Sequence, residues 1–141
     1  MTIKKLAGKW AKKPQNPLSK RLPESPKIQP KVLYFPTIWP IQKKSAACQR
    51  VKSISSYLAK NNFIIKMFCS AKINTEDKLF TGGINQMQID PNDHKEVEKH
   101  FNKFDSAPEF AIFDTFISEE KYSHFVKRYF PNCIKILDTQ D

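Results

Sequence analysis

The sequence predicts an α/β fold, with a Rossmann-like parallel sheet of about five strands, in the order 3-2-1-4-5, and flanking helices. Two observations lead to this prediction. Short apolar runs rich in strand-forming residues alternate along residues 31–141 with longer segments whose apolar residues recur at helical spacing. Strands that alternate with helices of this length are joined by right-handed crossovers, which makes neighbouring strands parallel.

The expected strands are short and mostly continuous in their apolar character, which is typical of parallel strands buried on both faces. "INQMQID" is the exception, because it alternates apolar and polar residues, and we place it at an edge of the sheet. The last strand is apolar enough to be buried and is followed by a few polar residues, but it comes last in the expected strand order. If the chain is truncated there, this strand leaves an open edge and an apolar face that a missing segment would cover. The expected strands are residues 31–35, 62–70, 84–90, 109–114 and 133–137.

Three helices are expected between these strands. The first begins at Ser45, whose hydroxyl is placed to cap it. The second follows "DPND", with Asp90 or Asn92 as its cap, and its apolar face includes Phe101. The third covers residues 117–130, with acidic residues in its first turn and basic residues in its last turn, as the helix dipole favours.

The basic character of the chain is concentrated at its amino terminus. Of the net charge of +10, residues 1–30 contribute +7 and residues 31–141 contribute +3. Residues 14–30 contain five prolines, so we expect an extended linker. Residues 2–13 fit a short basic amphipathic helix. This segment is open to three interpretations: a disordered tail, an organelle-targeting presequence, or a weak contact with an anionic membrane.

Several functions are disfavoured by what the sequence lacks. The loop after the first strand, "FPTIWPIQKKSAA", contains no glycine, whereas dinucleotide and phosphate-loop motifs need glycines there. The three histidines show no metal-ligand spacing with cysteines or acids, so we expect no metal. Nucleic-acid binding is not expected, because the charge lies in the tail and no recognition motif is present. We expect no cofactor in this chain and a cytoplasmic location, with organelle targeting through residues 1–30 as the alternative.

Polar residues follow the expected strands at their carboxyl ends, where parallel α/β sheets hold their ligands. Hydroxyl-rich ligands need several fixed donors and acceptors, and a carboxylate accepts hydrogen bonds from adjacent hydroxyls well. The alternative is that Ser45 is only a helix cap, and that Asp114 and Asp138 satisfy local backbone donors in turns. The ligand-side candidates are Gln42, Ser45, Arg50, Asp114, Thr115, Asp138 and Asp141.

Four stretches of the chain resemble the N-terminal domain of GT-B glycosyltransferases of the family 4-like group. They are "VLYFP" at Val32–Pro36, the loop from Gln42 to Arg50, "FDTFISEE" at Phe113–Glu120, and "PNCIKILDTQD" at Pro131–Asp141. The last is the most specific. The chain departs from the family pattern in its first loop, which carries Pro36, Trp39 and Pro40. It departs again in the spacing between Gln42 and Ser45, and at Lys135, where arginine is usual.

This resemblance implies transfer of a sugar from a nucleotide-sugar donor to an unknown acceptor, with residues 31–141 as the acceptor-side domain. The donor would be held by a second domain, so we expect the chain to be truncated after the fifth strand and inactive alone. A separate donor-binding half is then the implied partner. Whether the chain is itself an enzyme stays open, and no residue is assigned as catalytic. The alternatives are a non-catalytic binding or interaction module and a membrane-surface protein that uses the basic N-terminal segment.

Overall fold

The computed structural model describes residues 29–40, 45–74 and 83–139. The expected amphipathic helix of residues 2–13, most of the proline-rich linker, and the candidates Gln42 and Asp141 lie outside the described residues. None of the helices within the described ranges is long and apolar enough to cross a membrane. The elements in chain order are β1 (Lys31–Phe35), α2 (Ala46–Lys60), β2 (Ile64–Cys69), β3 (Ile84–Gln88), α3 (His94–Phe101), β4 (Phe110–Phe113), α4 (Phe116–Tyr129) and β5 (Ile134–Leu137).

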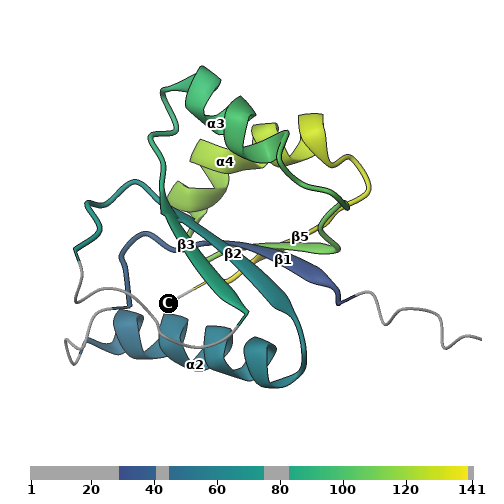
Figure 1. Cartoon of the computed structure of the whole chain (residues 1–141). Coiled ribbons are helices and arrows are strands. Elements are labelled where there is room, and N and C mark those ends of the chain that lie inside the picture. The colour runs from purple at the N-terminus through teal and green to yellow at the C-terminus, as the bar shows by residue number, and fades with distance from the viewer. Residues whose placement is uncertain (1–28, 41–44, 75–82, 140–141) are drawn as a thin grey trace, which may run out of the picture.

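The five strands form one sheet in the order β3-β2-β1-β4-β5, and every neighbouring pair is parallel. Helix α2 lies on one face of this sheet, and α3 and α4 lie on the other (Figure 1). The predicted fold class and strand order are therefore confirmed. The carboxyl ends of β1 and β4 meet at the centre of one edge of the sheet, and this edge is called the carboxyl edge below.

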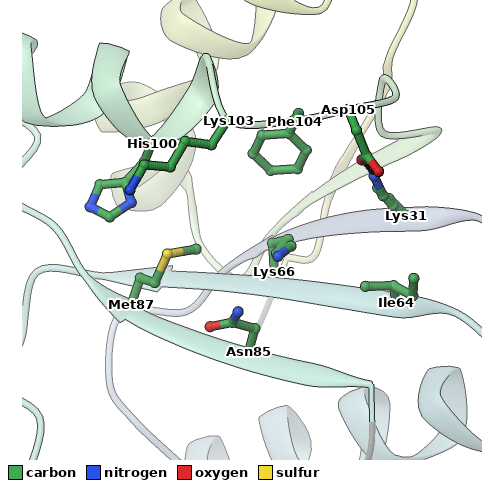
Figure 2. A pocket seen from close by; sticks show the side chains of 9 residues that line it. All are labelled: Lys31, Ile64, Lys66, Asn85, Met87, His100, Lys103, Phe104 and Asp105. Carbon is green, nitrogen blue, oxygen red and sulfur yellow. Dashed lines mark hydrogen bonds and ion pairs between the residues drawn. The ribbon is translucent and has the colours of Figure 1, made fainter.

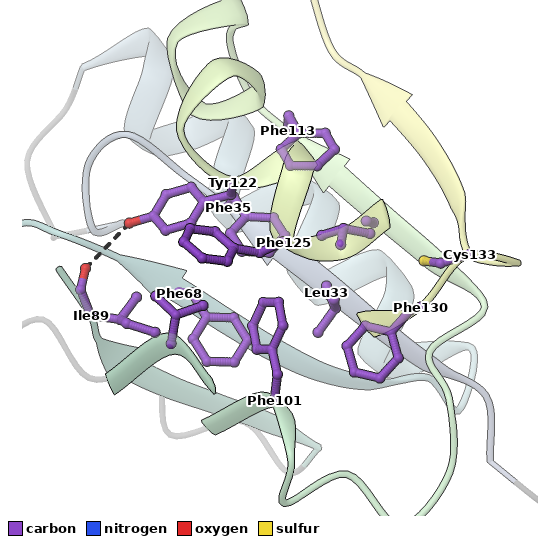
Figure 3. Packing of buried hydrophobic residues seen from close by; sticks show 13 residues of the cluster. Leu33, Phe35, Phe68, Ile89, Phe101, Phe113, Tyr122, Phe125, Phe130 and Cys133 are labelled. Atoms are coloured by element: carbon purple, nitrogen blue, oxygen red, sulfur yellow. Dashed lines mark hydrogen bonds between the residues drawn. The ribbon is translucent and has the colours of Figure 1, made fainter. Parts of the chain in front are cut away.

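Aromatic rings form the core between the sheet and helices α3 and α4. The Phe35 ring of β1 stacks against Phe113 of β4 and Tyr122 of α4, with ring centroids 5.1 and 4.8 Å apart (Figure 3). Phe68 of β2 belongs to the same cluster. The Tyr122 hydroxyl donates to the Ile89 carbonyl at 3.2 Å. Each such ring pair contributes about 1 kcal/mol beyond its area burial. These contacts fix α4 over the central strands.

The caps of α2 and α3 were both predicted, and only the first prediction is correct. Ser45 caps α2 as expected, because its Oγ accepts from the Cys48 N–H at 3.2 Å. The cap of α3 is Asp93, whose Oδ1 accepts from the Glu96 N–H at 3.1 Å, and not Asp90 or Asn92. Asp90 instead accepts from the Asn92 N–H at 2.9 Å, which forms the turn that precedes the helix.

The apolar sequence of the last strand indicates burial, but the strand is exposed, as its expected place at the end of the strand order implies. All four residues of β5 are exposed, with Ile134 at 57%, Ile136 at 41% and Leu137 at 43%. The cause is the position of β5 in the sheet. It is an edge strand, and α2 packs over β2, which lies three strands away in the same sheet. Ile134 and Ile136 pair in register with Phe110 and Ile112 and so share the α2 side of the sheet. Apolar sequence alone does not distinguish an open edge from a covered centre.

We predict that this exposed pair makes the chain self-associate, because apolar side chains on an open strand edge are a site for contact with another chain. Replacing both residues, Ile134→Ser with Ile136→Ser, should lower the weight-average mass in sedimentation equilibrium toward that of a monomer. Ile38→Ser, at a loop residue that is 38% exposed, is the matched control and should change nothing. A wild-type chain that is monomeric at high concentration would contradict the prediction.

Candidate functional site

The carboxyl edge contains a topological switch point between β1 and β4. The chain leaves β1 toward α2 on one face and leaves β4 toward α4 on the other, so the two connections diverge. In open α/β sheets, ligands bind in the crevice that such a divergence creates. The residues that follow the two strands here are Thr37 and Asp114.

Asp114 spans this switch point through its own side chain. It is 1% exposed, and its Oδ2 accepts from the Thr37 N–H at 2.8 Å and from the Thr37 Oγ1 at 3.0 Å. Its Oδ1 accepts from the Ser118 Oγ at 2.9 Å, at the start of α4. A buried carboxylate with three donors is well compensated for its loss of water. Asp114 therefore joins the two diverging loops through hydrogen bonds.

Thr115 also engages local backbone. Its Oγ1 accepts from the Ser118 N–H at 3.4 Å and so caps α4, as Ser45 caps α2. A capping hydroxyl still has its own proton to donate, so both side chains keep one hydrogen-bonding function. Ser45 is exposed and Thr115 is half-buried.

Arg50 and Asp138 form an ion pair that links α2 to the end of β5. The Arg50 Nε donates to Asp138 Oδ2 at 2.7 Å, and its second guanidinium nitrogen contacts Asp138 Oδ1. The pair is bidentate, which is the strongest geometry for an arginine and a carboxylate. Hydrogen bonding to Asp138 raises the pKa of Arg50. Two predicted site residues that are 88 positions apart in the sequence are thus brought together.

Tyr34 lies near Asp114 and the Arg50–Asp138 pair, and the sequence did not indicate it as a site residue. These four residues are called the carboxyl-edge cluster below. Tyr34 lies in β1 within an apolar run, a pattern that indicates a core residue, and it is fully buried. Among the described residues, its Oη has no hydrogen-bond partner. Burial raises the pKa of the Tyr34 hydroxyl far above its usual range, and the charges of Asp114 and Asp138 raise it further, while Arg50 lowers it. The hydroxyl is therefore neutral and able to donate.

A hollow of about 330 Å³ lies at the same edge, beyond the ends of β2 and β3 and against α4. The hollow could not be predicted from the sequence, because the polar residues that line it come from three separate segments. In the sequence, every one of these residues resembles an ordinary solvated side chain. Within the ranges described, no group of three or more His, Cys, Asp or Glu side chains could hold a metal ion. The residues that line the hollow are Ser70, Asp90, Pro91, Asn92, His94, Glu120, Lys121 and His124.

The Tyr34 hydroxyl, which has no partner among the described residues, generates the first prediction for this site. Tyr34→Phe should raise the free energy of unfolding by about 1 kcal/mol, because it removes a buried polar group that gains nothing from the fold. Tyr122→Phe is the matched control, since that hydroxyl is bonded to Ile89, and it should lower the free energy by about 1 kcal/mol. Denaturant unfolding measures both. A loss of stability in Tyr34→Phe similar to that in Tyr122→Phe would mean that Tyr34 is bonded within the fold.

The hydrogen bonds of Asp114 generate the second prediction. Asp114→Asn should lower the free energy of unfolding by about 2 kcal/mol, because the amide turns a donor toward groups that themselves donate. Thr37→Val alone should lower the free energy of unfolding by about 1 kcal/mol. When Asp114 is already replaced by Asn, the same substitution should lower it by less. Additive losses in this double-mutant cycle would show that the two side chains are not coupled.

Comparisons with known proteins give no match: no protein-family model matches the chain, and no match is found among curated proteins or among solved structures. The function is therefore inferred from the residues and their arrangement.

Proposed function

We propose that this chain is the acceptor-side domain of a GT-B-type glycosyltransferase and that it binds a hydroxyl-rich acceptor at its carboxyl edge. The observation that carries the proposal is the buried Tyr34 hydroxyl, which has no partner among the described residues and lies near the charges of Asp114 and Asp138. The resemblance of Phe113–Glu120 and Pro131–Asp141 to such enzymes supports it, because both stretches include the end of a strand at this edge.

The cluster offers the functions that a sugar hydroxyl needs. The Tyr34 hydroxyl can donate to one ligand oxygen and accept from another. The carboxylate of Asp138 has lone pairs beyond those that Arg50 uses, and its side chain is 15% exposed. The ion pair holds the Asp138 carboxylate in place and burial in β1 holds Tyr34, so an acceptor would meet preorganised partners and lose little of its binding energy to ordering them.

In this proposal the chain contributes binding and orientation, and the chemistry of transfer needs a nucleotide-sugar donor held opposite the acceptor. Fixing two reactants in a productive geometry is itself a large part of catalysis. A separate donor-binding half is the proposed partner, and the proposed location is the cytoplasm. No residue of the carboxyl edge is assigned as catalytic.

The exposed residues Ile134 and Ile136 favour a second candidate function, a non-catalytic interaction module that pairs with another copy of itself through β5. The two candidates use different residues. Acceptor binding depends on the cluster of Tyr34 and Asp138, whereas an interaction module depends on the apolar pair.

Acceptor binding is tested by saturation-transfer NMR of the chain with a panel of glycosides and oligosaccharides. We expect one class of acceptor to bind, and Tyr34→Phe to weaken its binding about tenfold, the value of one lost hydrogen bond in a buried site. Tyr57→Phe, at a tyrosine that is 68% exposed on α2, is the control and should bind normally.

Transfer itself is tested by adding a donor-binding half and following radiolabelled sugar from the nucleotide sugar into the acceptor that binds. Failure of every acceptor to bind, or equal binding by wild type and Tyr34→Phe, would contradict the proposal. The interaction module is favoured if no acceptor binds while the mass of the chain is unchanged in Tyr34→Phe and falls in Ile134→Ser with Ile136→Ser.

A further inference from the structure

A second cavity lies away from the carboxyl edge, on the face of the sheet that α3 and α4 cover. Its volume is about 460 Å³, within the range of small-molecule sites. The floor is formed by the first halves of β1 and β2 and by two residues of β3, Asn85 and Met87, and the loop after α3 forms the opposite wall (Figure 2). The eight residues of α3 span about 12 Å, less than the about 17 Å of a five-residue strand, so part of the sheet is left open beneath that loop.

The charge in this cavity is predominantly positive. Three lysines line it, Lys31, Lys66 and Lys103, together with His100. Asp105 is the one carboxylate among the described lining residues, and it is paired with Lys31. Lys66 and Lys103 form no salt bridge with any described residue. Burial and the nearby Lys103 both lower the pKa of His100, as expected where positive charge is not compensated.

Lys66 departs from the pattern of the sheet around it. It is in the middle of β2, an interior strand, and pairs in register with Leu33, which is fully buried, and with Asn85. Its neighbour on the same face, Phe68, is also fully buried. Interior parallel strands are normally apolar on both faces, and a lysine there is rare unless it is paired. Local departures of this kind are expected at functional sites.

Apolar side chains complete the cavity. Phe104 lies above Lys66 in the wall formed by the loop, and Ile64 and Met87 rise from the floor (Figure 2). All three are half-buried. The cavity therefore combines cationic groups with apolar and aromatic surface.

We propose that this cavity binds a small phosphorylated molecule with an aromatic or other apolar body. Lysine ammonium groups hold a phosphate as point charges, and the ring of Phe104 and the aliphatic side chains accept the apolar part. The site is independent of the proposed function, because it lies under the loop after α3, toward the amino ends of β1 and β2, and shares no described residue with the carboxyl-edge cluster.

The test uses the full chain and 1-naphthyl phosphate as the probe, with 1-naphthol and inorganic phosphate as compounds that lack one of the two features. Isothermal titration should show saturable binding of 1-naphthyl phosphate and at least tenfold weaker binding of the other two. Lys66→Met, which keeps the length of the side chain and removes its charge, should weaken binding of the probe at least tenfold. Lys52→Met, at an exposed lysine of α2, is the matched control and should bind as wild type does.

Two further readouts separate binding in this cavity from non-specific binding to the basic tail. Without probe, Lys66→Met should melt at a higher temperature than wild type, because the substitution removes a cation that has no salt-bridge partner among the described residues. Adding probe should raise the melting temperature of wild type but not that of Lys66→Met. The variant Lys12→Gln with Lys13→Gln, in the basic tail, should bind normally. The proposal is overturned if the probe does not bind, if the tail variant loses binding, or if Lys66→Met binds as tightly as Lys52→Met.

Discussion

The carboxylate of Asp114 determines what the carboxyl edge of this sheet can do. It is buried at the switch point between β1 and β4, where a fold of this kind opens a crevice for ligands, and it accepts three hydrogen bonds from Thr37 and Ser118. The two loops that diverge from the switch point are held together, and the start of α4 is held with them.

The other polar groups at this edge lie on either side of the switch point. On the α2 side, the ion pair of Arg50 and Asp138 lies close enough to Tyr34 for their charges to act on its hydroxyl. On the α4 side is the polar hollow beyond β2 and β3. The aromatic stack around Phe35 packs the central strands against α4, and this holds the start of α4 in place beside the ends of β1 and β4. A rigid scaffold of this kind is what a site built for orientation needs.

Most of the fold could be predicted from the sequence, because the alternation of apolar runs and helical spacings determines the order of elements and the parallel sheet. The exposure of β5 follows from its place at the end of the predicted strand order and not from its composition, since "CIKIL" is as apolar as the central strands. The candidate site was found in part. Asp114, Asp138 and Arg50 are candidates from their positions in the sequence, but the structure was needed to show that Asp114 pairs with Thr37, 77 residues away, and Asp138 with Arg50, 88 residues away. Tyr34 could not be found at all, because a tyrosine in an apolar strand resembles any core residue until its hydroxyl is seen to lack a partner.

The ionisation of the Tyr34 hydroxyl is the most informative quantity to measure for the proposed acceptor site. The chain can be labelled with ¹³Cζ-tyrosine, and the Tyr34 signal can be assigned by its absence in Tyr34→Phe. Its chemical shift is then followed as the pH is raised. We expect the signal to stay at its neutral value through the ordinary tyrosine range, about pH 10, because burial and two carboxylates oppose ionisation. A Tyr34 signal that titrates near pH 10 would show a solvated hydroxyl, and the buried unpaired donor on which the proposed acceptor site depends would not exist.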